Sequence, residues 1–148
     1  GLKSWEMFNY INSIKTKDGY IKKEDVNFSY RETKIDTIIY EVVFNIESGF
    51  CKEKLKEFNK MRDNQPHVPS AGSCFKNPKG DFAGRLIEAI GFKGIKQGDM
   101  SFSEQHANFL VNYGNGSFED AVYLIEVAKK KIKEEFSIDI EEEIIIYK

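Results

Sequence analysis

The sequence predicts an α+β fold whose first part is rich in strands and whose second part packs helices against a small sheet. Apolar and polar residues alternate from Thr37 to Ile46, which is the period of a half-buried strand. From Phe118 to about Phe136 the apolar residues recur instead at spacings of three and four, which predicts a long amphipathic helix. We therefore expect a β-rich part in residues 1–49 and an α+β part in residues 50–148.

The β-rich part begins with a hairpin signal. Ile11 and Ile14 precede Lys17-Asp18-Gly19, which is typical of a tight turn between antiparallel strands. The later strand places its apolar side chains on one face, formed by Ile38, Tyr40, Val42, Phe44 and Ile46. A few strands without a helix make a poor domain by themselves. We therefore interpret residues 1–49 as the end of a larger domain.

The second part carries signals for helices at three places. The first lies between Cys51 and Arg62, where every third residue is apolar. The second is expected to have Asp81 as its cap and to end at Gly91. The third is expected to begin directly after Ser117, which together with Asp120 resembles a capping box. The predicted apolar faces of the first two helices are Leu55, Phe58 and Met61, and Phe82, Leu86, Ile87 and Ile90.

Short strands are expected around these helices. Two of them are Met100–Ser103 and Phe109–Asn112, and a final strand is expected from Ile140 and from Ile144–Tyr147. Together they would form the small sheet against which the helices pack.

Composition and charge exclude several classes of protein. Apolar residues make up 41% of the chain and the net charge is −2, so we expect a folded domain without a charge-driven nucleic-acid or membrane partner. Cys51 and Cys74 form no disulfide or zinc pattern, and no apolar run approaches the ~20 residues of a membrane span. The first six residues lack the features of a signal peptide. We expect a cytoplasmic protein without a metal site.

One stretch combines small residues, a charge and an amide in a way that a surface turn does not require: Pro69-Ser70-Ala71-Gly72-Ser73-Cys74-Phe75-Lys76-Asn77-Pro78. Its small residues let the backbone come close to a ligand, and Gly72 permits a positive φ. Lys76 and Asn77 add a charge and an amide directly after an aromatic side chain. This stretch is therefore a candidate binding loop.

Two further strings follow it in order, Gly80-Asp81-Phe82-Ala83-Gly84-Arg85-Leu86-Ile87-Glu88 and Ser103-Glu104-Gln105-His106-Ala107-Asn108-Phe109-Leu110-Val111-Asn112. Together the three resemble the UDP-N-acetylenolpyruvoylglucosamine reductase family, which completes UDP-N-acetylmuramate in bacterial peptidoglycan synthesis. Tyr30-Arg31 resembles the tyrosine-arginine motif of that family, and residues 138–144 resemble its last strand, which carries a glutamate. Thr33 and Gly98-Asp99-Met100 depart from the family pattern.

The resemblance implies FAD and NADPH as cofactors and UDP-N-acetylglucosamine enolpyruvate as substrate. The segment from Arg31 to Leu55 has no room for the extra tyrosine loop of the longer subtype, so the chain is similar to the shorter one. The FAD-binding segments of the family would lie upstream of Gly1. Residues 1–49 would then end the FAD-binding domain, and residues 50–148 would be the substrate-binding domain.

The resemblance also implies roles for individual residues. In the family, a hydride passes from NADPH through FAD to the vinyl carbon, and Ser73 would donate the proton. Arg31 would bind the substrate carboxylate through two hydrogen bonds, and Glu143 would act near the same carboxyl group. The implied substrate-binding residues are Tyr30, Lys76 and Asn77.

Each catalytic candidate has a simpler interpretation. Ser73 can be a turn serine that bonds the backbone. Arg31 can be a surface arginine paired with Glu24 or Glu32, and Glu143 belongs to an acidic run of a kind that is usually solvated. The resemblance leaves the roles of His106 and Asn108 unassigned and the flavin-binding residues unknown, and Cys74 is interpreted as a small packed residue.

A competing interpretation is a non-catalytic α+β module that binds a nucleotide or a protein partner. The order of Tyr30-Arg31, Ser73 and Glu143 along the chain favours the enzyme. We expect the chain alone to be inactive, and the strands of residues 1–49 to be able to pair with another copy.

Overall fold

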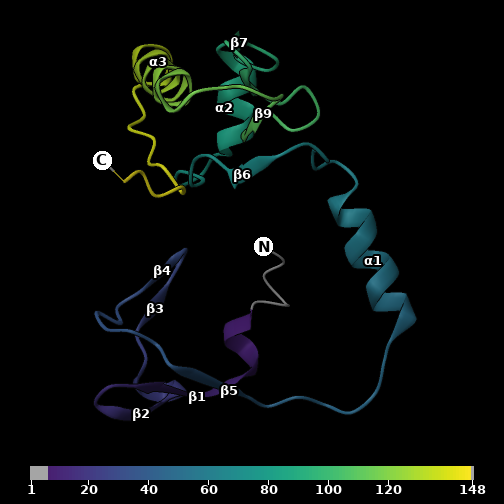
Figure 1. Cartoon of the computed structure of the whole chain (residues 1–148), viewed down its shortest axis with the longest axis vertical. Coiled ribbons are helices and arrows are strands. Elements are labelled where there is room, and N and C mark those ends of the chain that lie inside the picture. Colours follow the sequence, from purple (N-terminus) through teal and green to yellow (C-terminus); the bar gives the residue numbers. More distant parts are fainter. Residues whose placement is uncertain (1–6, 148) are drawn as a thin grey trace. The chain divides into compact units, whose positions relative to one another are not determined.

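The computed structural model describes residues 7–147 and divides into two compact units, Gly1–Lys52 and Glu53–Lys148 (Figure 1). The predicted α+β class is confirmed by helices that accompany antiparallel sheets. Residues 1–6, on which the argument against a signal peptide depended, lie outside the described residues. No helix in the described part of the chain is long and apolar enough to cross a membrane.

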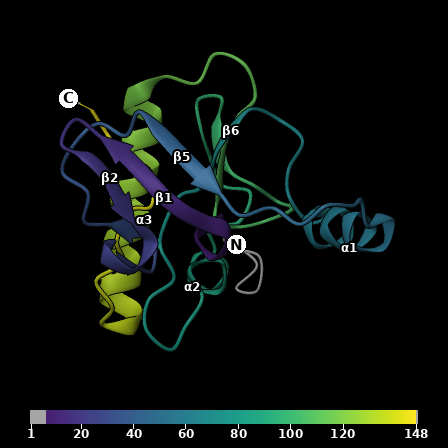
Figure 2. The same ribbon diagram turned by 90° about the horizontal axis from the view of Figure 1, so that it is seen from below.

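The first unit is built on a three-stranded antiparallel sheet in which β1 lies between β2 and β5 (Figure 2). The predicted hairpin is confirmed, because Thr16 pairs with Gly19 across a two-residue turn and Gly19 has a φ of 113°. The elements are the 3-10 helices η2 (Met7–Tyr10) and η3 (Lys23–Asp25) and the strands β1 (Ile11–Thr16), β2 (Gly19–Lys22), β3 (Phe28–Ser29), β4 (Glu32–Thr33) and β5 (Glu41–Phe44).

The core of the first unit is small. Its buried apolar residues are Ile11, Ile14 and Val26, and partly buried side chains such as Val42 pack against them. The predicted strand from Thr37 to Ile46 is too long, because β1 pairs with β5 only between Lys15↔Glu41 and Ile11↔Phe44. The predicted apolar face is mostly solvent-exposed: Ile38 is 69%, Tyr40 62% and Ile46 85% exposed.

The second unit contains an antiparallel four-stranded sheet in the order β6-β9-β8-β7 (Figure 1). Strands β8 and β9 confirm the predicted strands to within one residue. The strands are β6 (Ser70–Ser73), β7 (Lys96–Gln97), β8 (Met100–Phe102) and β9 (Phe109–Asn112), and the helices are α2 (Ala83–Ala89) and α3 (Phe118–Phe136).

The remaining helix, α1 (Lys52–Arg62), begins at the last residue of the first unit. It confirms the predicted helix before Asn64, but none of its residues is buried. Leu55 and Met61, on the predicted apolar face, are exposed. The periodicity of a helix therefore does not by itself show that a partner covers it.

The core of the second unit lies between the two remaining helices and the sheet. The helices contribute Leu86 and Ile87 from α2 and Leu124 and Ile125 from α3, and the sheet contributes Phe102. Phe82 and Phe118 were predicted to lie on the apolar faces, but they are 69% and 54% exposed. Phe82 is the capping residue before α2, and Phe118 is the first residue of α3.

Helix α3 begins and ends at the predicted residues. The Asp120 amide donates to Ser117 Oγ at 3.1 Å, and the Ser117 amide donates to Asp120 Oδ2 at 3.2 Å. This is a complete capping box with aspartate in the third position. Ser137 ends the helix in the left-handed conformation, with a φ of 58°.

Candidate functional site

Ser73 is the last residue of β6 and follows an irregularity in the pairing of β6 with β9. Ser70 pairs with Val111 and Ser73 with Phe109, so β6 has one extra residue between the two pairs. Gly72 takes up this extra residue with a φ of 81°, a conformation that favours glycine. Such a bulge re-aims the side chain that follows it. Ser73 is half-buried, and its hydroxyl makes no hydrogen bond within residues 7–147.

The chain leaves the sheet directly after Ser73. Cys74 and Phe75 are both buried, as are successive residues of β8 and β9. The Cys74 amide donates to the Asn108 carbonyl at 2.7 Å. The Phe75 amide donates to Asn108 Oδ1 at 3.0 Å, and Asn108 Nδ2 donates to the Phe75 carbonyl at 2.8 Å. The Asn108 side chain therefore continues the pairing where the backbone of β9 has ended.

Residues 141–143, near the end of the chain, lie along the other edge of residues 74–76. The Lys76 amide donates to the Glu141 carbonyl, and the Glu143 amide donates to the Cys74 carbonyl, each at 2.8 Å. Phe75 and Glu142 form an isolated antiparallel bridge between these bonds. The predicted final strand over Ile140 and Ile144–Tyr147 is therefore wrong, because residues 74–76 are too short a partner for more than one bridge.

Two ion pairs hold Glu141 and Glu142 of this terminal segment. Lys129 Nζ lies 2.7 Å from Glu142 Oε1, and both side chains are partly buried. Burial by itself would raise the pKa of Glu142, but the hydrogen bond and charge of Lys129 lower it below its usual value. Lys76 Nζ lies 3.3 Å from Glu141 Oε2, whose side chain is mostly exposed. The first pair therefore anchors the segment more firmly than the second.

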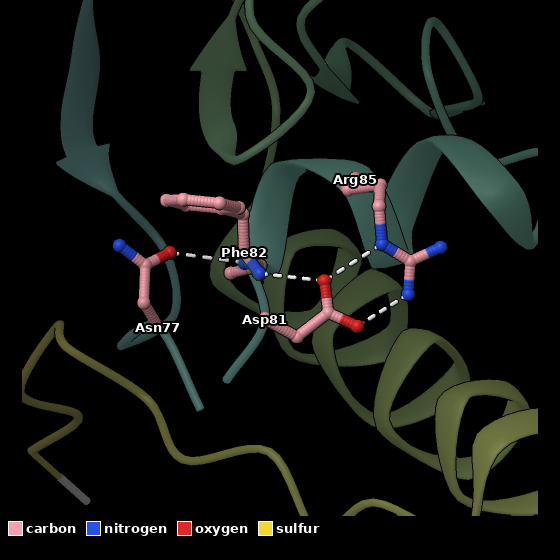
Figure 3. A network of polar contacts seen from close by, with 5 residues as sticks. Asn77, Asp81, Phe82 and Arg85 are labelled. Carbon is pink, nitrogen blue, oxygen red and sulfur yellow. Dashed lines mark hydrogen bonds and ion pairs between the residues drawn. The ribbon is translucent and has the colours of Figure 1, made fainter. Parts of the chain in front are cut away.

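Asn77 lies directly beyond this segment and caps α2. Its Oδ1 accepts a hydrogen bond from the Ala83 amide at 3.0 Å (Figure 3). Asp81 was predicted to cap the helix, but the capping position is Phe82. Asp81 Oδ1 instead accepts from the Phe82 amide and from Arg85 Nε, each at 2.7 Å. The Arg85 hydrogen bonds, followed by that of Phe82, lower the pKa of Asp81 to about 2.

Tyr30 and Arg31 form the two-residue turn between β3 and β4 in the first unit. Arg31 has a φ of 62°, which is uncommon for a residue other than glycine. Its guanidinium carbon lies 5.7 Å from the centre of the Tyr30 ring, within the range of a cation–π contact. Both side chains are exposed. The turn therefore presents a positive group and an aromatic ring together.

His106 and Cys74 belong to the scaffold of the loop. His106 Nδ1 accepts a hydrogen bond from the Asn108 amide at 3.3 Å. The His106 and Phe109 rings pack edge to face, with their centres 4.8 Å apart. Burial, with a smaller effect of Glu142, raises the pKa of Cys74 to about 12. The Cys74 thiol therefore stays protonated and is a poor nucleophile or metal ligand.

The second unit thus brings together four of the predicted site residues: Ser73, Lys76, Asn77 and Glu143. The other two, Tyr30 and Arg31, belong to the first unit. Sequence reasoning missed Asn108 as the residue that organises the loop, since its position before a strand carries no signal of a buried amide. Within residues 7–147 no group of three or more histidine, cysteine or acidic side chains could hold a metal ion.

A family model described as UDP-N-acetylenolpyruvoylglucosamine reductase, C-terminal domain, matches residues 64–147. The chain belongs to this family. The match confirms the resemblance seen in the sequence motifs, and it contains Ser73, Lys76, Asn77 and Glu143. Tyr30 and Arg31 precede the matched residues.

Relatives of the UDP-N-acetylenolpyruvoylglucosamine reductase family align with nearly the whole chain. The reductase of Campylobacter jejuni (strain RM1221) is 47% identical, over 99% of this chain and 57% of that protein. The reductase of Helicobacter hepaticus is 44% identical, over 99% of this chain and 56% of that protein. The crystal structure of the Thermus caldophilus reductase superimposes with a TM-score of 0.84 at 29% identity, over 100% of this chain and 57% of that one. The chain therefore spans little more than half the length of these relatives.

Proposed function

We propose that this chain supplies the substrate-binding and proton-donating residues of a reductase acting on UDP-N-acetylglucosamine enolpyruvate. The product would be UDP-N-acetylmuramate, a precursor of peptidoglycan. The observation that carries the proposal is the hydrogen bond from the Glu143 amide to the Cys74 carbonyl, which joins two proposed catalytic segments in a chain of this family. In this proposal, residues 1–49 end a FAD-binding domain and residues 50–148 bind the substrate.

Ser73 is the proposed proton donor. Reduction of the enolpyruvyl double bond adds a hydride to the terminal carbon and a proton to the carbon that bears the carboxylate. FAD, reduced by NADPH, would supply the hydride when bound. A serine hydroxyl is a weak acid, so it protonates carbon only where a strongly basic, enolate-like group has formed. The bulge at Gly72 and the lack of a hydrogen bond to the Ser73 hydroxyl in the described chain suit this role.

Arg31 and Glu143 are proposed to act on the substrate carboxylate. The guanidinium would hold it through two hydrogen bonds and stabilise the negative charge that develops beside it. Glu143 would act as a hydrogen-bonding acid at the same group, from a backbone position fixed by Cys74. The ring of Tyr30, in contact with the Arg31 guanidinium, would restrict that side chain and meet the substrate.

Lys76 and Asn77 are proposed to bind the nucleotide-sugar. The pair of Lys76 with the exposed Glu141 contributes little to stability, so diphosphate oxygens can replace the carboxylate at small cost. Asn77 Oδ1 accepts from the Ala83 amide, which fixes the side chain proposed to contact the sugar.

The described residues do not identify a site for FAD. A surface hollow of about 560 Å³ in the first unit is lined by Asn9, Tyr10, Phe44, Asn45, Ile46 and Glu47. Its charged residue is acidic, whereas the diphosphate of a dinucleotide requires cations or backbone amides. We therefore assign no flavin-binding residue in this chain.

The proposal is tested with the complete reductase that contains this chain. With NADPH and UDP-N-acetylglucosamine enolpyruvate, we expect UDP-N-acetylmuramate by mass spectrometry and oxidation of NADPH at 340 nm in equal amounts. Binding of the nucleotide-sugar without any product, measured by calorimetry on the same protein, would support a non-catalytic binding module and reject the proposal.

A further inference from the structure

Asn108 is a buried polar residue to which neither the sequence motifs nor the proposed chemistry assigns a role. It is 4% exposed and stands directly before β9. A carboxamide carries both a hydrogen-bond donor and an acceptor, so it can pair with the amide and the carbonyl of one residue. Asn108 does this with Phe75 at 3.0 and 2.8 Å.

These bonds are made at a place where the amide and the carbonyl of Phe75 have no backbone partner in the described chain. The pairing of β6 with β9 ends at Ser73 and Phe109, yet Cys74 and Phe75 remain buried. A buried amide or carbonyl without a partner is costly, so the Phe75 groups need a substitute for the missing strand. The Asn108 side chain is that substitute.

The same short segment carries the terminal residues on its other edge. The two polar groups of Phe75 face Asn108, whereas the Cys74 carbonyl and the Lys76 amide bond Glu143 and Glu141. Residues 74–76 are thus held from two sides, as in the middle of a sheet. On one side, the Asn108 side chain bonds both polar groups of Phe75 and the Asn108 carbonyl accepts from the Cys74 amide. The other side carries Glu143.

We propose that Asn108 is a positioning residue that holds Ser73 and Glu143 in register by clamping residues 74–75; the inference rests on the proposed function of those two residues. Asn108 touches no reacting atom. Its loss should free the segment between them and so misplace both groups at once.

The clamp is tested first on the 148-residue chain by amide hydrogen exchange. We expect Asn108→Ala to raise the exchange rates of Phe75 and Glu143 about tenfold or more, while the Val111 amide inside β9 keeps its protection. Asn112→Ala is the control, because Asn112 also bonds backbone groups, those of Gly114 and Gly116, but none in residues 74–76. Unchanged exchange at Phe75 and Glu143, or equal loss at Val111, would overturn the clamp.

The consequence for catalysis is tested in the complete reductase. Asn108→Ala should lower kcat for the oxidation of reduced flavin by substrate about tenfold or more, with a smaller change in KM and no change in flavin reduction by NADPH. Asn108→Asp should be similarly slow at neutral pH and should recover at acidic pH, because a protonated carboxyl again presents one donor and one acceptor.

The outcomes separate this inference from the proposed function. If the unmodified reductase forms no product, the proposed function fails and the exchange result still decides the clamp. If the unmodified reductase is active and Asn108→Ala retains full kcat, or Asn108→Asp shows no acid recovery, the positioning role is rejected.

Discussion

The backbone amide of Glu143 lies 2.8 Å from the carbonyl oxygen of Cys74, so the proposed acid is bonded to the neighbour of the proposed proton donor. The relationship is made through the main chain, and it therefore survives substitution of either side chain. Replacing Ser73 or Glu143 should for this reason report on the chemistry of the side chain more than on the position of the segment.

We expect Ser73→Ala to slow oxidation of the flavin by substrate ~10²–10⁴-fold, because one positioned acid is lost. Flavin reduction by NADPH should be nearly unchanged, since it requires no proton from Ser73. Stopped-flow absorbance separates the two half-reactions. Ser70→Ala is the companion variant, because it removes the bond from the Gly72 amide to Ser70 Oγ and leaves the proposed donor in place, so it measures the effect of the bulge alone. Equal slowing of both half-reactions would reject the role of Ser73.

We expect Arg31→Lys to lower turnover by about 10–100-fold, because the charge remains but the two-pronged contact with the carboxylate is lost. Flavin binding should hold. Steady-state kinetics and the visible spectrum measure the two effects, and Arg62→Lys serves as the control. If Arg62→Lys reduces turnover and Arg31→Lys does not, the carboxylate site belongs to Arg62.

We expect the Lys129–Glu142 pair to make stability depend on acid pH. The folded-state pKa of Glu142 is lowered, so its contribution is present above the usual value of 4.5 and is lost as the pH falls through the lower folded value. Glu142→Gln should therefore reduce the free energy of unfolding by about 1 kcal/mol at neutral pH and by progressively less below pH 4.5.

Urea denaturation followed by circular dichroism at several pH values measures this difference. Glu134→Gln is the matched control, because Glu134 lies 3.9 Å from Lys130 in an exposed pair. A constant effect of Glu142→Gln from pH 7 to pH 3 would contradict the coupling to Lys129.

We expect alanine to have opposite effects at two glycines of the second unit. Gly84 lies in α2, and an added Cβ would lie 3.7 Å from the His106 ring and 3.9 Å from Asn108 Cβ, which is ordinary contact. Gly84→Ala should raise the free energy of unfolding by about 0.5–1 kcal/mol. At Gly116, a Cβ would lie 2.6 Å from the Met100 side chain and 2.9 Å from its backbone nitrogen. Gly116→Ala should lower the free energy of unfolding by about 1–3 kcal/mol. Thermal melting would measure both changes.

We expect residues 1–148 alone to bind no flavin and to oxidise no NADPH. The hydride chemistry belongs to the cofactor, and the described residues do not identify a flavin site. The exposed apolar side chains of residues 38–46 should also cause weak self-association, visible by gel filtration. A yellow monomer carrying one FAD per chain would contradict both expectations.

Local signals in the sequence determined the elements whose partners are close in the chain. Helix α3 has the predicted bounds because its capping box and apolar periodicity both lie within the helix. The hairpin of β1 and β2 was predictable for the same reason, since the turn signal Lys17-Asp18-Gly19 lies between the two strands in the sequence. The family motifs likewise lie in continuous strings, so membership followed from the sequence.

Only the tertiary structure decided which distant segments meet at the candidate site. Lys76 and Glu141 are 65 residues apart, and nothing in the local pattern shows that residues 74–76 pair with residues 141–143. The periodicity of the last segment predicts a strand, but a strand needs a backbone partner along its length, and only Phe75 bridges it. On the other edge of residues 74–76, the Asn108 side chain bonds the amide and the carbonyl of Phe75 in place of a neighbouring strand. No local pattern in the sequence predicts these bonds, because they depend on where β9 ends in space.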